Sequence, residues 1–393
     1  MTANHGVAHW SGAAAANLDT ALRKSQQVAT VAPMSTTPER VREVIERSGH
    51  SHREFAELVG LDASKLSKSL AGTRRFTSVD LARIGDLGAV SIEWLLGGEE
   101  PPLALAARAA SGSSTRDAVE EAHVLASHRD GLSELGHPQR WHFPTPPPRT
   151  GSWITDGEQL AAAALSHVAN QGIDVQGPSL AAVVEEGFGI DVAVRDLGAD
   201  FDGLSVATPT CRLILLAPTA APFRPRFTLA HELGHLLGGD DQGLHVDADI
   251  DHIDRSETEV RASAFAAAFL MPQTVVIDAM KADRSFEGFC ALAMTLRVSP
   301  SALANRLKAL RAIDGMTASR WGRTSAKEAA QASGQIEALH EATNLAASTR
   351  LPGLLTRDAF AAYQAGDTTL RPYAALIGAD VDRLRAALED DAT

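Results

Sequence analysis

The stretch Arg226-Phe-Thr-Leu-Ala-His-Glu-Leu-Gly-His-Leu-Leu237 predicts a buried helix that carries a metal site. At 3.6 residues per turn, His231 and His235 project from one face of this helix, one turn apart. Two imidazoles at this spacing bind one Zn²⁺, and Glu232 can take a proton from a metal-bound water. The alternative is a coincidental pattern on a buried helix. We favour a zinc hydrolase, because buried polar side chains cost free energy unless they have partners.

A tetrahedral zinc needs a third protein ligand, and two downstream carboxylates are candidates. Asp241 follows Gly238 at the spacing used when the chain turns sharply and returns a ligand to the metal. Glu259 opens an amphipathic stretch that ends at Pro272 and predicts a second helix packed across the first. The residues alone leave both candidates open. Between them, residues 240–254 hold six aspartates with His245 and His252. We expect a solvated acidic loop; the alternatives are a second metal site or a substrate-facing loop.

The 393-residue chain has a net charge of −13, with 45% hydrophobic and 22% charged residues. This composition indicates globular domains and argues against a general polyanion binder, so contact with nucleic acid needs a local basic patch. The two cysteines, Cys211 and Cys290, are too few for a disulfide framework and fit a reducing compartment. No apolar run approaches the length of a membrane span, and no signal peptide opens the chain. We therefore expect a cytoplasmic protein that does not bind membranes.

Residues 35–98 are predicted to form an all-α helix-turn-helix domain, preceded by a disordered tail over residues 1–34. Its first helices are expected at 38–49, 53–59 and 62–70, because apolar residues recur at helical spacing and glycines follow each run.

The third of these helices and the loop after it are locally basic. No acidic residue falls between Ala63 and Val79, whereas the first helix carries Glu39, Glu43 and Glu46. A basic helix of this kind suits base-edge and phosphate contacts with a double-stranded DNA operator. The alternative is a small helical interaction module with a solvated lysine face. The predicted DNA-contacting residues are Ser64, Lys65, Ser67, Lys68, Arg74 and Arg75.

This domain resembles the phage-repressor-like (XRE/Cro) helix-turn-helix family. The resemblance is carried by Arg53-Glu-Phe-Ala-Glu-Leu-Val-Gly-Leu61 and by Ser64-Lys-Leu-Ser-Lys-Ser-Leu-Ala-Gly72. It implies a helix that enters the major groove of DNA and a homodimer that reads two half-sites. His52 stands where the family often has glutamine.

Three further segments complete the chain. Residues 99–150 are predicted to be a helical and proline-rich linker, with one helix at roughly 115–135. Residues 151–313 are predicted to form the domain that carries the metal helix, with a small antiparallel sheet directly before it. A helical C-terminal module without an assigned role is expected over residues 314–393.

Most of the second domain, residues 157–313, resembles the ImmA/IrrE metallopeptidases. The resemblance is carried by Arg226–His235, by the helix Glu259–Pro272 and by Arg297–Leu307, while Ser263 stands where the family often has asparagine. It implies a zincin-like zinc metallopeptidase domain, in which Glu232 is the general base and the zinc ligands are His231, His235 and Glu259.

The predicted fold class is thus α+β and mostly helical. The resemblances imply a regulatory zinc-dependent endopeptidase that binds DNA and relieves repression by cutting a protein substrate, a partner transcriptional repressor. The rival is a non-proteolytic transcription factor that uses the peptidase-like fold as a ligand sensor. The intact motif from His231 to His235 favours the enzyme, because a sensor has little need to keep the base Glu232.

Overall fold

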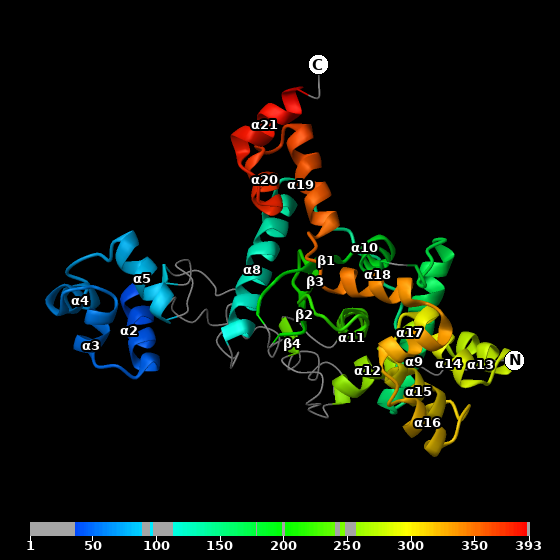
Figure 1. The fold of residues 1–393 in the computed structure, drawn as a ribbon. Coiled ribbons are helices and arrows are strands. Elements are labelled where there is room, and N and C mark those ends of the chain that lie inside the picture. Colours follow the sequence, from blue (N-terminus) through cyan, green and yellow to red (C-terminus); the bar gives the residue numbers. More distant parts are fainter. Residues whose placement is uncertain are drawn as a thin grey trace, which may run out of the picture. The chain divides into compact units, whose positions relative to one another are not determined.

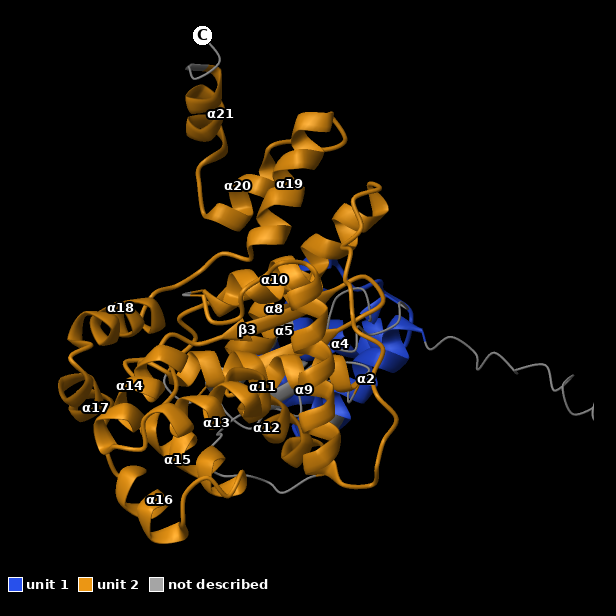
Figure 2. Cartoon of the chain, turned by 90° about the vertical axis from the view of Figure 1, so that its right-hand side faces the viewer, with its two compact units in different colours: residues 1–100 blue, residues 101–393 orange. Residues whose placement is uncertain are grey.

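The computed structural model describes residues 36–88, 95–96, 113–177, 179–198, 201–239, 244–247 and 257–390. The chain divides into two compact units, Met1–Glu100 and Pro101–Thr393, which Figure 2 colours separately. Helices dominate both units, and one small sheet lies in the second (Figure 1). The predicted α+β, mostly helical class is confirmed. The predicted tail over residues 1–34 and the ligand candidate Asp241 lie outside the described residues.

In the first unit, the described residues form helices whose boundaries follow from their capping residues. Ser51 accepts a hydrogen bond from the N–H of Glu54, and Asp62 accepts from the first turn of the helix that follows it. An apolar core that includes Phe55 and Leu66 holds the helices together. The three helices predicted for this region are confirmed, and the helices are α2 (Thr37–Ser48), α3 (His52–Leu58), α4 (Ala63–Leu70) and α5 (Ser78–Gly88).

The sheet of the second unit is mixed, so the prediction of an antiparallel sheet is wrong for one strand pair. Its strands are β1 (Asp191–Val194), β2 (Gly203–Ala207), β3 (Arg212–Leu216) and β4 (Leu244–Asp247), in the order β1-β3-β2-β4. The strand β3 returns antiparallel to β2 and lies between β2 and β1, which makes it parallel to β1. The order of strands in a sheet is set by tertiary packing, and the β-rich runs in the sequence do not show that β3 lies beside β1.

The fourth strand is a second departure from the sequence-based prediction. It lies within residues 240–254, for which we favoured a solvated acidic loop and expected no strand. Leu244 and Val246 alternate with polar residues along β4, which pairs antiparallel with β2 and places Leu244 opposite Val206. This two-residue alternation is short, and the surrounding aspartates conceal it in the sequence.

Helices cover both faces of the sheet and form two cores. Along β3, Ile214 and Leu216 belong to the first core, whereas Leu213 and Leu215 belong to the second. Buried residues of α9 (Trp153–Asn170), α10 (Leu180–Phe188), α11 (Arg224–Gly238) and α12 (Glu257–Leu270) complete the first core. Buried residues of α8 (Ser113–Glu134) and α19 (Gly353–Ala365) complete the second core.

The helix α8 lies in the segment predicted to be a linker, and it is tied to the sheet by a buried ion pair. Arg129 is fully buried and donates to both carboxylate oxygens of Asp191 on β1, at 2.6 and 2.9 Å. It also donates to Asp358 on α19 at 2.7 Å. Burial alone would lower the pKa of Arg129, but these two carboxylates raise it overall. The predicted domain boundaries after residues 150 and 313 stay predictions.

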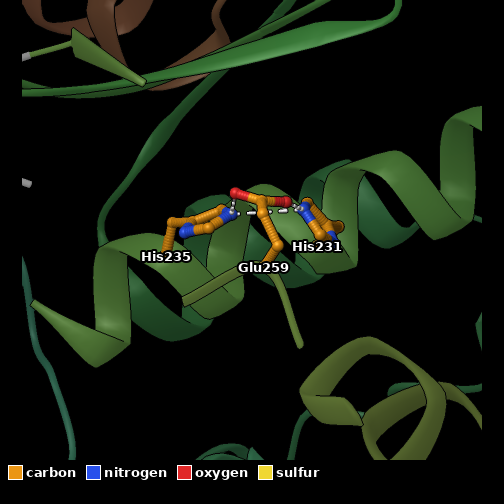
Figure 3. Close-up of side chains that lie close together, drawn as sticks. All are labelled: His231, His235 and Glu259. Atoms are coloured by element: carbon orange, nitrogen blue, oxygen red, sulfur yellow. Dashed lines mark hydrogen bonds and ion pairs between the residues drawn. The ribbon is translucent and has the colours of Figure 1, made fainter. Parts of the chain in front are cut away.

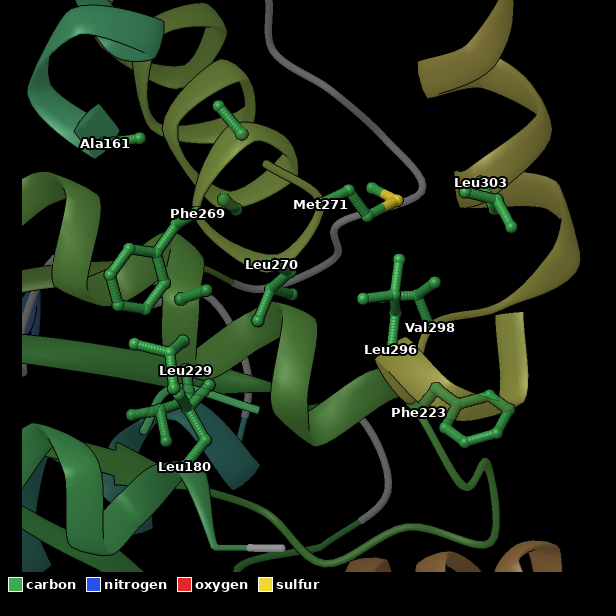
Figure 4. Packing of buried hydrophobic residues seen from close by; sticks show 14 of the residues in the cluster. Ala161, Leu180, Phe223, Leu229, Phe269, Leu270, Met271, Leu296, Val298 and Leu303 are labelled. Carbon is green, nitrogen blue, oxygen red and sulfur yellow. The ribbon is translucent and has the colours of Figure 1, made fainter. Parts of the chain in front are cut away.

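The remaining helices extend the first core and form the C-terminal segment. Met271, Leu296, Val298 and Leu303 are buried in this core, and Figure 4 shows its packing. In the described part of the chain no single helix is long and apolar enough to span a membrane. The consecutive helices α12 and α13, bent by 49° at the break between them, reach that length and apolar composition only when taken together. The remaining helices of the described chain are α13 (Gln273–Ala282), α14 (Phe286–Leu296), α15 (Pro300–Ala309), α16 (Gly315–Trp321), α17 (Ala326–Ser333), α18 (Ile336–Ala346), α20 (Arg371–Ile377) and α21 (Val381–Asp390).

Candidate metal centre

The predicted metal helix is α11, and its ends are defined by local chemistry. Pro225 lies in its first turn, where the missing N–H costs nothing, and Gly239 ends it with a positive φ of 64°. From Arg226 to Leu237 every residue except Phe227 is buried. The helix therefore runs through the core, and its polar side chains are held in a largely solvent-free environment.

Three side chains from two helices meet beside α11 (Figure 3). The Nε2 atoms of His231 and His235 are 3.1 Å apart. From the first turn of α12, Glu259 places Oε2 3.0 Å from Nε2 of His231 and Oε1 3.2 Å from Nε2 of His235. The structure thus brings together the two histidines of the motif and one of the two candidate third ligands.

The geometry of this cluster fits a zinc ion. Two ligands bound to zinc at about 2.0–2.1 Å in a tetrahedron lie about 3.3 Å apart, close to the observed spacings. Two imidazoles and one carboxylate are also a donor set typical of catalytic zinc. The histidines are each 2% exposed, and the side chain of Glu259 is 17% exposed. The cluster is therefore buried on the α11 side and accessible beside Glu259.

Gly234 allows α12 to pass close enough for this contact. A Cβ atom at Gly234 would lie 3.2 Å from the Cα of Ala262 and 3.0 Å from Cδ1 of Phe265. A larger residue at this position would push the two helices apart. This explains why a glycine is found in the middle of α11, although glycine in a helix interior lowers stability by about 0.5–1 kcal/mol relative to alanine. The close crossing brings Glu259 over the two histidines.

The predicted general base, Glu232, is fully buried next to the first ligand candidate on α11. Gly203, at the start of β2, packs against this part of the helix. A Cβ atom at Gly203 would lie 3.6 Å from Cγ of Glu232 and 2.6 Å from Cγ2 of Thr228. The sheet therefore packs against Glu232, and the absence of a side chain at Gly203 makes room for the neighbouring Thr228.

Ser263 is a further residue of the site. Its Oγ lies 3.5 Å from Nδ1 of His231, the ring nitrogen that does not face the cluster. Metal-binding histidines usually have a partner at this second nitrogen, which orients the ring. No role was predicted from the sequence for Gly203 or Gly234, and Ser263 was noted only because the resembled family often has asparagine at its position. Gly234 also carried a signal, since an isolated glycine in a helical pattern often marks a close approach.

Two arginines fix the ends of the metal helix. Arg226 donates to the carbonyl of Val175 at 2.7 Å, and burial together with the nearby charge of Arg297 lowers the pKa of Arg226 to about 10. Arg261 on α12 donates to the carbonyl of Gly238 at 3.3 Å, and burial is the main cause that lowers the pKa of Arg261. These bonds hold α11 in position at both ends.

In the first unit, the predicted DNA-contacting residues lie on α4 and in the loop after it. All are exposed except Arg74, which pairs with Asp80 at 2.9 Å and donates to Ser69. Burial raises the pKa of Asp80, but hydrogen bonds from Thr77 and Arg74 outweigh this and lower it overall. Arg74 thus also stabilises this unit, whereas the exposed residues are Ser64, Lys65, Ser67, Lys68 and Arg75.

Comparison with known proteins agrees with this geometry. Residues 185–308 match the IrrE N-terminal-like domain (Peptidase_M78). This segment contains the whole cluster of His231, His235 and Glu259 and also Glu232. The chain therefore carries an IrrE-like metalloprotease domain.

A distant relative is the radiation response metalloprotease IrrE of Deinococcus radiodurans, which is 37% identical over 99 residues. The aligned part covers 24% of this chain and 28% of the relative. The family match begins at residue 185, so it does not reach residues 35–98, where the helix-turn-helix assignment stays a prediction.

Proposed function

We propose that this chain is a DNA-binding regulatory zinc metallo-endopeptidase that relieves repression by cutting a partner transcriptional repressor at a specific site. The observation that carries the proposal is the convergence of His231, His235 and Glu259 within 4.8 Å, beside the buried Glu232 and inside an IrrE-like domain. A cluster built only for stability would not need two histidines and a carboxylate at these distances.

The chemistry assigned to the residues follows from their positions. His231, His235 and Glu259 would hold Zn²⁺, which when bound supplies a Lewis acid and lowers the pKa of its water towards 7. Glu232 accepts the proton of the attacking water and returns it to the leaving amine. Its burial keeps the carboxylate away from bulk solvent, so the proton is kept within the site.

The regulatory half of the proposal rests on the first unit. Its exposed lysines, Lys65 and Lys68, lie on a helix without acidic residues, although the whole chain has a net charge of −13. A local basic helix on an acidic chain favours a specific duplex over general attraction to polyanions. We propose a homodimer that reads two half-sites, in a cytoplasmic protein that makes no membrane contact.

The peptidase half is tested with Glu232→Gln, which keeps the shape of the side chain but cannot accept the proton. We expect zinc content and DNA occupancy to stay unchanged, while cleavage of the partner repressor falls by about 10²–10⁴-fold. Glu257→Gln, an exposed glutamate at the start of α12, is the matched control. Cleavage is followed by blot and induction by a promoter assay. Equal induction by wild type and Glu232→Gln would favour the ligand-sensor alternative.

The DNA-binding half is tested with Lys68→Ala in the full chain. If Lys68 contacts a base, the binding free energy at the selected operator should fall by about 1–3 kcal/mol. If it contacts a phosphate, the slope of log K against log salt concentration should become smaller by about one. Lys308→Ala, exposed on α15 of the other unit, is the control and should change neither quantity. Failure of the wild type to enrich any sequence in a genomic selection would refute this half alone.

A further inference from the structure

A groove of about 760 Å³ runs beside the candidate metal centre. Its walls include residues of α11 and α12, the two helices that carry the ligand candidates, and of α15. Thr228 in its lining lies one turn before His231, and Ser263 in its lining contacts the ring of that histidine. Two other pockets, of about 550 and 240 Å³, have no lining residue on α12. The groove therefore lies next to His231, between the two helices that carry the ligand candidates.

The lining of this groove is mainly apolar. Its volume falls in the range of about 300–1,000 Å³ that is common for ligand sites, so it has room for more than one side chain. Ile154 at its edge remains 57% exposed, although it is a large apolar residue. Figure 4 labels Phe223, Met271 and Val298 among the core residues, and the groove is also lined by Phe227, Val260 and Ala267.

The charged side chains of the lining already have partners within the protein. Arg306 is 7% exposed and forms an ion pair with Glu158, which also lines the groove. Arg224 pairs with Asp202 at 2.6 Å. Among the described lining residues these are the charged ones. A charged segment that entered the groove would lose water without gaining a counter-charge, whereas an apolar segment would gain by leaving water.

Resting on the peptidase function proposed above, we infer that this groove binds an uncharged segment of the protein substrate and places its large apolar side chains beside the cleaved bond. Two residues of the lining, one on α12 and one on α15, control access. Ala267 lies on α12 two turns beyond Glu259, and its small side chain leaves the groove open. Asn305 is exposed on α15. The helix α15 is therefore part of the substrate site.

The test measures binding, so that it does not depend on turnover. Full-length, zinc-loaded Glu232→Gln protein is titrated into two fluorescein-labelled glycine–serine peptides, one with Leu-Phe at its centre and one with Ser-Ser. Binding is read by fluorescence anisotropy. Burial of one or two large apolar side chains predicts that the Leu-Phe peptide binds about tenfold to a hundredfold more tightly. Equal affinity for the two peptides would overturn the inference.

Variants of the walls locate the binding site. In the same background, Ala267→Phe and Asn305→Trp should each reduce the affinity for the Leu-Phe peptide by about tenfold, because the added rings occupy the space of the peptide side chains. Ala361→Phe, on an exposed position of α19, is the control and should leave the affinity unchanged. Asn305 is exposed, so Asn305→Trp remains informative if Ala267→Phe fails to fold. Unchanged affinity in both folded groove variants would overturn the inference.

A parallel cleavage assay separates this inference from the proposed peptidase function. If the wild type cuts its repressor and both groove variants cut it with the same kcat/KM, the groove assignment fails and the peptidase function stands. If the Leu-Phe peptide binds and the groove variants weaken it, but the wild type cuts no repressor, the groove assignment stands as a binding site and the peptidase function fails.

Discussion

Replacing Glu259 with alanine should weaken zinc binding by about tenfold or more, which corresponds to about 1.4 kcal/mol or more. The magnitude follows from the spacing of the three side chains: the two Nε2 atoms are 3.1 Å apart, and each lies 3.0 or 3.2 Å from the nearer carboxylate oxygen of Glu259. These values are within a few tenths of an ångström of the edge of a zinc tetrahedron, about 3.3 Å. The three side chains need little rearrangement to bind the ion. Removing the carboxylate therefore removes the free energy of its bond to zinc, with little saved reorganisation to offset the loss.

The chain offers a matched control for this substitution. Glu257 lies two residues earlier on the same first turn of α12, is exposed and is not part of the cluster. Glu257→Ala should therefore bind zinc as the wild type does, and Asp241→Ala should be nearly silent. Zinc is measured by competition with a chromophoric chelator on full-length protein, with circular dichroism to confirm folding. Stoichiometric zinc in Glu259→Ala, together with its loss in Asp241→Ala, would refute the reasoning and make Asp241 the third ligand.

Two further substitutions test the surroundings of the site. Ser263→Ala should weaken zinc binding or slow turnover by on the order of tenfold, because the second ring nitrogen of His231 loses its contact with the Ser263 hydroxyl; a chelator titration checks this. Arg129→Met should lower the free energy of unfolding by about 3–5 kcal/mol, because it leaves the carboxylate of Asp191 buried without its counter-charge. Urea unfolding measures this loss, with the exposed Arg357→Met expected to cost at most about 1 kcal/mol, and equal losses in both variants would contradict the argument.

Local chemistry in the sequence was sufficient to predict the helices that matter here. The caps at Ser51 and Asp62, the glycines that follow each helical run and the apolar spacing from Phe227 to Leu237 act within one or two turns of chain. The pairing of His231 with His235 is equally local, because the geometry of a helix alone places residues four apart on one face. A candidate metal site could therefore be predicted from the spacing of its residues.

The identity of the third donor, the strand order and the groove depend on contacts between distant segments. Glu259 reaches the histidines only because Gly234 lets two helices cross closely, and β3 lies between β1 and β2 only in the folded sheet. Residues of α9, α11, α12 and α15 form one groove although they are scattered along the chain from Ile154 to Ala309. Local propensity carries no information about such contacts, since each depends on how whole faces of helices and strands exclude water together.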